Sequence, residues 1–397
     1  MGRRILIVVK SAGLVWVVLA LLLSVEGRGL VQAAEPIKVG AVLSVTGYAG
    51  LIGTPQMEAI QVFAEKTNRE GGVLGRPIEV YFEDDQSNPA NSVIATSKLI
   101  HKKKVCVIIG STLTNMCMSM LPLFQRERVP NVSFGAGHEI TDPLRKWVFR
   151  ITLTDIRLSP VMLKFAAEKL GARRIALLHG TDASGMMGAK GVKENATKYG
   201  IEIVITEMFD PKDTNMVPQL TKIKTVRPDT IILYSNAAPA AVVAKNCREL
   251  GMEQIPVIGS HGIPGPEFIK LVGNTVEKGR WIFLSIKSAI VDKLPPNDPY
   301  RQNLYDPFIK GFREKFGAAK RFGPAHGNGY DGFLAVISAL KTAGTDDPAS
   351  MRDAMEKTSF EGFNGPFNYS PTDHDGQDVT RSRIPVIIKD GEFWPYK

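Results

Sequence analysis

Short apolar runs alternate with helix-like segments along most of this chain. The runs are rich in β-branched residues and end at small or polar residues, a pattern typical of strands buried on both faces of a parallel sheet. Neighbouring parallel strands need a crossover connection, usually a helix, so the alternation predicts β-α units with right-handed crossovers. We expect strands at 37–43, 78–82, 105–109, 130–134 and 148–152 and, after a helix at 158–170, at 174–178, 201–205, 230–234, 256–259 and 281–284.

The restart of this pattern after residue 158 predicts an α/β fold with two sheets. The chain has 397 residues, of which 44% are hydrophobic and 22% charged, and this is enough for two separate cores. A proline-rich stretch at 294–299 cannot continue a helix and separates the second sheet from three more helices. These helices are expected at 300–316, 325–343 and 348–357, and a last apolar strand at 384–388.

The N-terminus has the parts of a secretory signal peptide. Basic residues precede the apolar stretch 12–25, and small residues at 31–33 supply a cleavage point before Ala34. A retained membrane anchor is the alternative, but about 14 apolar residues fall short of the roughly 20 that span a bilayer. We therefore expect residues 1–33 to be removed and the protein to be exported, most simply to the periplasm.

Charge and metal-binding residue types argue against several partners. The formal net charge is +9, but its one basic run, 101–104, has no interleaved aromatic residues and falls where it complements the dipole at the end of a helix. The three cysteines are expected to be buried thiols, and the six histidines are dispersed without a CxxC or HExxH motif. We expect no nucleic-acid partner, no metal and no cofactor.

A hydroxyl-rich turn follows the strand at 105–109. Ser111, Thr112, Thr114 and Asn115 stand directly before an apolar helical segment, so one of them can cap that helix. In an open α/β sheet, ligands bind in the crevice at the carboxyl ends of the strands, and a helix N-terminus with free N–H groups suits a carboxylate. The alternative is an ordinary cap and turn.

No catalytic constellation accompanies this turn in the sequence. A G-x-S-x-G nucleophile elbow is missing, and the glycines at 135–137 lack the third glycine of a dinucleotide-binding loop. Asp84 and Asp85 stand at a strand end, where a solvated position competes with acid–base or metal chemistry, and His261 is either a ligand contact or a plain loop residue. We therefore expect a binding protein and not an enzyme.

Several segments together resemble the leucine/isoleucine/valine-binding family of periplasmic solute-binding proteins that serve ABC importers. The resemblance extends from residue 35 to residue 397. It is carried by IKVGAVLSVTGYAGLIG, NREGGVLGRPIEVYFEDDQSNPANSVIATSKLI, IIGSTLT, VPNVSFGAG, FRITLTD, RIALLHGTDASG, PDTIILYSNAAPAAVVAKNCRELGM and GYDGFLAV, in this order and behind a signal peptide.

The resemblance implies two Rossmann-like lobes with parallel-rich sheets, joined by a hinge of three crossings near Thr154, Trp281 and Phe360. A small solute would lie between the lobes, and the protein would deliver it as a monomer to the membrane subunits of an ABC permease. The implied division places 34–154 and 285–358 in the first lobe and 155–284 and 359–397 in the second.

The family pattern also maps onto individual positions. The substrate carboxylate would be held by two segments of the first lobe, and the second lobe and the cleft walls would supply further contacts. The positions implied are Thr112, Leu113, Thr114, Gly135, Ala136 and Gly137 for the carboxylate, Ser184, Asn236 and His261 from the second lobe, and Ile52 and Ala325 as apolar walls.

Two positions depart from the pattern of amino-acid binders. His261 stands where such proteins place a glutamate that pairs with the ligand ammonium, and Ser184 stands where many carry an aromatic ring. An unpaired buried ammonium is costly, which favours a carboxylate solute without an ammonium group unless Asp155 or Asp182 supplies the negative charge. The expected function is therefore capture of an amino acid or a related organic acid, and the alternatives are a sensory ligand-binding module and a secreted enzyme acting on a small acid.

Overall fold

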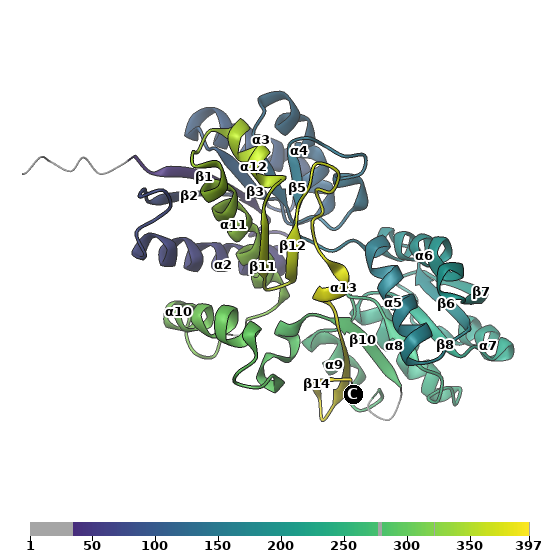
Figure 1. The fold of residues 1–397 in the computed structure, drawn as a ribbon. Coiled ribbons are helices and arrows are strands. Elements are labelled where there is room, and N and C mark those ends of the chain that lie inside the picture. The colour runs from purple at the N-terminus through teal and green to yellow at the C-terminus, as the bar shows by residue number, and fades with distance from the viewer. Residues whose placement is uncertain (1–34, 277–279, 321, 397) are drawn as a thin grey trace, which may run out of the picture.

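The computed structural model describes residues 35–276, 280–320 and 322–396, and the expected signal peptide at 1–33 lies outside them. Figure 1 shows two lobes, each built on one sheet with helices around it, and the predicted α/β fold class is confirmed. Within the described residues, no helix has both the length and the apolar character needed to cross a bilayer.

The first sheet has five parallel strands in the order β2-β1-β3-β4-β5. The inner strand β1 contributes to two cores, because side chains of a strand point alternately to opposite faces. In β1, Val39 and Ala41 face the core formed with α2, α10 and α11, whereas Val42 faces the core formed with α3 and α4. The strands are β1 Ile37–Leu43, β2 Ile78–Asp84, β3 Val107–Gly110, β4 Asn131–Ser133 and β5 Val148–Arg150. The helices are α2 Gly50–Arg69, α3 Pro89–Lys98, α4 Thr114–Glu127, α10 Asp306–Phe316, α11 Pro324–Ala343 and α12 Pro348–Met355.

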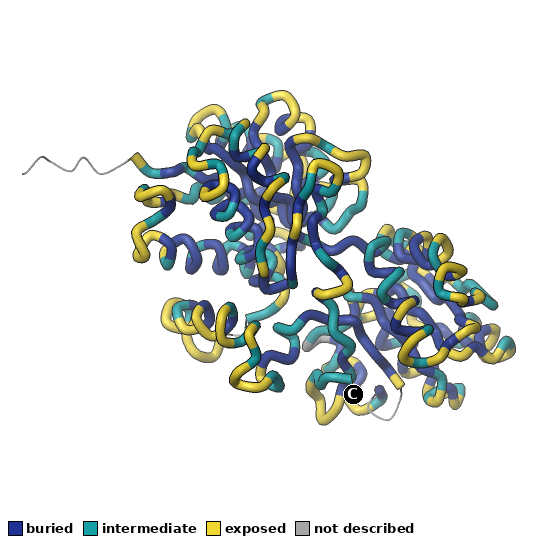
Figure 2. The backbone as a smooth tube through the Cα atoms, in the orientation of Figure 1, coloured by how far each residue is buried: buried dark blue, intermediate teal, exposed yellow. Residues whose placement is uncertain are grey.

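The second sheet has seven strands in the order β14-β13-β10-β9-β8-β6-β7. Five strands are parallel, and the two C-terminal strands join antiparallel at one edge. Helices cover both faces, and the inner strands between them are buried, as the dark blue segments of Figure 2 show, whereas the edge strands β7 and β14 are mostly half-buried. The strands are β6 Arg174–Gly180, β7 Glu202–Phe209, β8 Thr230–Tyr234, β9 Val257–Gly259, β10 Trp281–Ser285, β13 Ile384–Lys389 and β14 Glu392–Pro395. The helices are α5 Asp155–Lys169, α6 Ala183–Asn195, α7 Val217–Val226, α8 Ala237–Glu249, α9 Pro266–Val272 and the short α13 Val379–Ser382.

The segment after α12 packs differently from the expected division of the chain. A hairpin of β11 Ser359–Gly362 and β12 Gly365–Asn368 leads to Tyr369, and Phe367 and Tyr369 belong to the core of the first lobe. His374 then stacks on Phe149 of β5 with ring centroids 4.0 Å apart. The expected boundary at residue 359 is therefore too early.

The change of lobe occurs further along the chain at two of the three crossings. Trp281 lies inside β10 and in the second core, so the second crossing follows Ser285. Val379 packs in the second lobe, which puts the third crossing near Asp378. The first change of core falls between Ile151, which packs in the first core, and Leu153, which packs in the second. We propose a division in which 359–377 belong to the first lobe.

Candidate functional site

A buried carboxylate forms a hydrogen bond with the turn after β3 and fixes its position. Asp85, which is fully buried, accepts hydrogen bonds from the Ser44 hydroxyl at 2.7 Å and from the Ser111 hydroxyl. The Thr112 hydroxyl donates to Gln56 Oε1 at 2.8 Å and accepts from the Ser44 N–H at 3.0 Å. Both hydroxyls thus fix the turn to β1, β2 and α2. We therefore expect Thr112 to contribute its backbone to a ligand, since its side chain is already engaged.

The N-terminus of α4 leaves donors without acceptors. The first N–H groups of an α-helix have no partner within the helix, and the N-cap residue Leu113 supplies no side-chain hydrogen bond to them. Thr114 Oγ1 accepts the N–H of Gly137 at 2.9 Å, which leaves its own proton free to be donated to a ligand. The helix dipole adds positive potential at this end. The arrangement can therefore bind an anionic group.

The loop after β4 lies directly against this helix end. A Cβ atom at Gly137 would stand 2.3 Å from Thr114 Cγ2, and one at Gly135 would stand 2.4 Å from Ile140 Cδ1. Glycine is required at both positions because the loop approaches the turn so closely. The two carboxylate segments implied by the sequence, 112–114 and 135–137 with half-buried Ala136 between the glycines, are thus adjacent in the structure.

An ion-pair cluster anchors that loop to the hinge. The Arg150 guanidinium donates to the Gly137 carbonyl and pairs with Asp375, and Arg150 is fully buried. Arg157 binds Asp373 through two hydrogen bonds of 2.9 and 3.0 Å and lies 3.1 Å from Asp375. Because the two arginines flank the first crossing and the two aspartates precede the third, the cluster ties these crossings together.

The second lobe contributes a buried acid that the sequence analysis named only as an alternative charge. Asp155, at the start of α5, accepts the Ser184 hydroxyl at 2.8 Å, and its Oδ1 lies 3.5 Å from His261 Nδ1. Burial raises the pKa of Asp155, and the neighbouring imidazole opposes that rise. Burial lowers the pKa of His261, and the nearby carboxylate of Asp155 acts in the opposite direction. Neither Asp155 Oδ1 nor His261 Nδ1 has a hydrogen-bond partner among the described residues, so both remain available to a solute.

Other expected contacts lie at the rim. Asn236 is exposed at the start of α8 and donates to Asp182 at 3.3 Å. Ile52, 40% exposed, lies in the first turn of α2, and half-buried Ala325 lies in the first turn of α11. The Asn236 side chain lies against Gly262, the residue after His261: a Cβ atom at Gly262 would stand 2.8 Å from Asn236 Oδ1.

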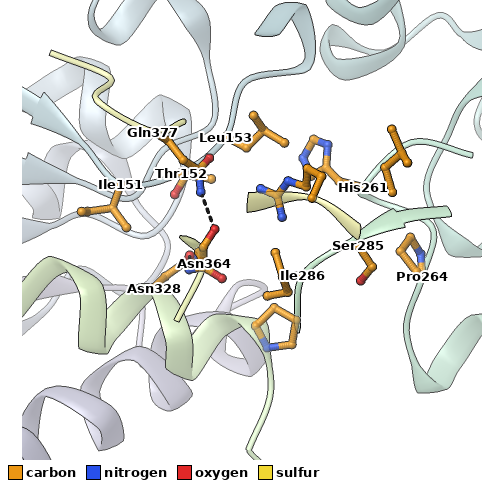
Figure 3. Close-up of a pocket in the computed structure, with 13 residues that line it drawn as sticks. Ile151, Thr152, Leu153, His261, Pro264, Ser285, Ile286, Asn328, Asn364 and Gln377 are labelled. Carbon is orange, nitrogen blue, oxygen red and sulfur yellow. Dashed lines mark hydrogen bonds between the residues drawn. The ribbon is translucent and has the colours of Figure 1, made fainter. Parts of the chain in front are cut away.

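A pocket lies between the lobes at the hinge. It has a cavity volume of about 110 Å³ and is lined by residues 151–153 at the first crossing, 284–286 at the second, and Gln377 and Arg383 at the third. Figure 3 shows His261 reaching it from the second lobe and Asn328 and Asn364 from the first. Of the site residues expected from the sequence, His261 alone lines this pocket. Sequence reasoning missed the others because most of them come from the crossings, from α11 and from the β11–β12 turn, and not from strand-end loops. No described group of three His, Cys, Asp or Glu side chains could hold a metal ion.

Residues 36–382 match the family model of the periplasmic binding protein. The chain belongs to this family. The match spans both lobes and all three crossings, and the family resemblance drawn from the sequence motifs is thereby confirmed. As a periplasmic binding protein, the chain is a solute-binding protein of the transport type.

Several known proteins are similar over nearly the whole chain. A leucine-, isoleucine-, valine-, threonine- and alanine-binding protein of Pseudomonas aeruginosa is 23% identical and aligns with 83% of this chain and 84% of its own. An extracellular ligand-binding receptor from Rhodopseudomonas palustris HaA2 superposes with a TM-score of 0.74 at 26% identity, covering 91% of this chain and 100% of its own. The branched-chain amino acid transporter substrate-binding protein LivJ of Streptococcus pneumoniae, solved with isoleucine, gives 0.70 at 22% identity, with 90% and 98% covered.

Proposed function

We propose that this protein captures an amino acid or a related small organic acid between its lobes and delivers it to the membrane subunits of an ABC importer. The observation that carries the proposal is the uncapped N-terminus of α4, with the Thr114 hydroxyl beside it and the glycine loop at 135–137 packed against it. The solute carboxylate lies there, and the rest of the solute faces Asp155 and His261 of the second lobe. The names of the similar proteins, which include a Leu/Ile/Val-binding protein of Escherichia coli, support a solute of this class.

Location and partners follow from the same proposal. The predicted signal peptide at 1–33 exports the protein to the periplasm, where a single copy closes over its solute. The Asp155 cluster argues against catalysis, because Ser184 donates its proton to the carboxylate of Asp155 and not to His261. A nucleophilic serine needs a hydrogen-bonded base such as histidine, so this serine serves binding.

A thermal-shift screen tests this function. The panel compares leucine, isoleucine and valine with their deaminated 2-oxo acids, because the two series differ only in the ammonium group. At one hundred times Kd, a bound solute stabilises the folded protein by about 2.7 kcal/mol, which moves the melting temperature by several degrees. We expect at least one acid to raise the melting temperature in this way. Its amide, which lacks the negative charge, should not raise it. An amide that binds as tightly as its acid, or the absence of any shift when acidic amino acids and dicarboxylates are added to the panel, would contradict the proposal.

Replacement of Thr114 tests the carboxylate position. Thr114→Val removes the proton donor to the solute carboxylate and also the acceptor of the Gly137 N–H. We expect calorimetry with the tightest acid of the panel to record a loss of about 1 to 2 kcal/mol in binding free energy. Thr114→Ser keeps the hydroxyl and should bind within a few-fold of the unmodified protein. Equal affinity of all three proteins would exclude Thr114 from the site.

A further inference from the structure

One arginine in the hinge pocket has no counter-ion among the residues that the structure describes. Arg383 lies between α13 and β13, just after the third crossing, and lines the pocket between the lobes. Its Nε is buried without a hydrogen-bond partner. Burial alone lowers its pKa to about 10, and no carboxylate of the described residues acts on it in the opposite direction. Desolvation of a guanidinium is costly unless an anion compensates its charge.

The other two arginines of the hinge, fully buried Arg150 and half-buried Arg157, are paired. Arg150 has Asp375, and Arg157 has both Asp373 and Asp375. The fold therefore supplies carboxylates to the cations that it buries for structural reasons. Arg383 differs because its surroundings are the pocket, and not a carboxylate on a neighbouring element.

A second unsatisfied group lines the same pocket. Gln377 is only 3% exposed, and its Nε2 donates to the Asn364 carbonyl at 3.0 Å, as Figure 3 shows. This bond fixes the orientation of the amide, and Gln377 Oε1 is left buried without a donor. Buried polar atoms are nearly always hydrogen bonded, so an unpaired acceptor and an unpaired cation that line one pocket indicate a binding site for a polar ligand. The polar groups of that ligand must include an acceptor with negative charge and a donor.

We propose that the solute carries a second acidic group, which lies on the Arg383 guanidinium, and that an N–H or O–H donor of the solute binds Gln377 Oε1. This inference rests on the proposed function, since it concerns the other end of the same solute. Arginine binds a carboxylate through two parallel N–H donors, which makes it selective for such a group. The solute class is therefore the diacids, either acidic amino acids or dicarboxylates without an amino group. The two classes differ in the amino group. If Asp155 pairs with the ammonium of the solute, the solute is an acidic amino acid.

A set of matched acids tests the assignment by calorimetry. The monoacids are leucine and 4-methyl-2-oxopentanoate, and the diacids are glutamate, 2-aminoadipate, 2-oxoglutarate and 2-oxoadipate. We expect the best diacid to bind at least tenfold more tightly than either monoacid. Tighter binding of the amino diacids than of the oxo diacids identifies an acidic amino acid, and the reverse identifies a dicarboxylate.

Arg383→Gln, with Arg381→Gln as its control, locates the preference. Arg381 lies two residues away, is exposed and pairs with Glu361 outside the pocket. The tenfold preference for diacids should disappear in Arg383→Gln and persist in Arg381→Gln. If Arg383→Gln does not fold, the comparison of acids in the unmodified protein still decides. Equal binding of monoacids and diacids, or a preference that survives in Arg383→Gln, would overturn the second acidic group and leave the proposed function intact. Failure of every acid to bind would overturn the proposed function itself.

Discussion

Asp375→Asn is expected to lower the free energy of unfolding by about 3 to 5 kcal/mol, measured by urea denaturation at pH 7. The substitution keeps the size of the side chain but removes the counter-ion of Arg150, which is fully buried. Removal of one partner of a buried ion pair leaves an uncompensated charge in a medium of low dielectric constant, and such losses are of this size. Arg157 retains Asp373, so the hinge is weakened and not dismantled.

The stability of the unmodified protein and that of Asp375→Asn should depend differently on pH. The arginines hold the pKa values of Asp373 and Asp375 below the ordinary aspartate value in spite of burial. A lowered pKa in the folded state stabilises the protein above the unfolded value of about 3.9, and this stabilisation is lost as the pH falls through the lowered pKa. Acidification from pH 7 to pH 3 should therefore cost the unmodified protein more stability than Asp375→Asn.

An exposed ion pair provides the control for this prediction. Glu361 and Arg381 have side chains that are 66% and 64% exposed, and Glu361→Gln should change the free energy of unfolding by at most about 1 kcal/mol. A loss in Asp375→Asn no larger than in Glu361→Gln would show that the hinge does not depend on the buried pair.

Much of the architecture was predictable because it follows from local patterns. The alternation of apolar runs and helices gave the parallel strands, and the strand at 37–43 has the expected bounds. The turn after β3 was also predictable, because a hydroxyl-rich segment between a strand and a helix in such a sheet has few other positions. These signals lie within a few residues of one another in the chain.

The remainder depends on contacts between distant parts of the chain. The hairpin at 359–368 belongs to the first lobe because its aromatic residues pack there, and no local pattern says which core they join. The Thr112 hydroxyl was expected at the ligand, yet it binds Gln56, 56 residues earlier in the sequence. Nothing in the sequence around Arg383 and Gln377 marks these two residues of the C-terminal segment as site residues. Their importance follows from the absence of partners in the pocket, which the sequence does not record.

Gly110→Ala should have the other large effect, because Gly110 is the last residue of β3 and immediately precedes the turn. Its φ angle is +107°, a region that side-chain-bearing residues rarely adopt. A Cβ atom there would lie 2.0 Å from the carbonyl oxygen of Val42, a backbone atom of the neighbouring strand β1 that cannot move aside. Backbone strain and overpacking together should cost about 2 to 5 kcal/mol in the free energy of unfolding. Displacement of the turn should also weaken acid binding by at least about tenfold, or 1.4 kcal/mol.

Gly71→Ala separates the effect of backbone strain from that of overpacking. Gly71 has a similar φ of +101°, but a Cβ atom there would have no neighbour within 4 Å. It should lose only the strain contribution, about 1 to 2 kcal/mol, and bind acids as the unmodified protein does. Denaturation and calorimetry on both variants then measure what the contact between β1 and the end of β3 adds. If the two alanine variants lose the same stability and retain the same affinity, the close approach of Gly110 to Val42 does not position the turn, and the carboxylate site must be fixed by Asp85 and its hydrogen bonds alone.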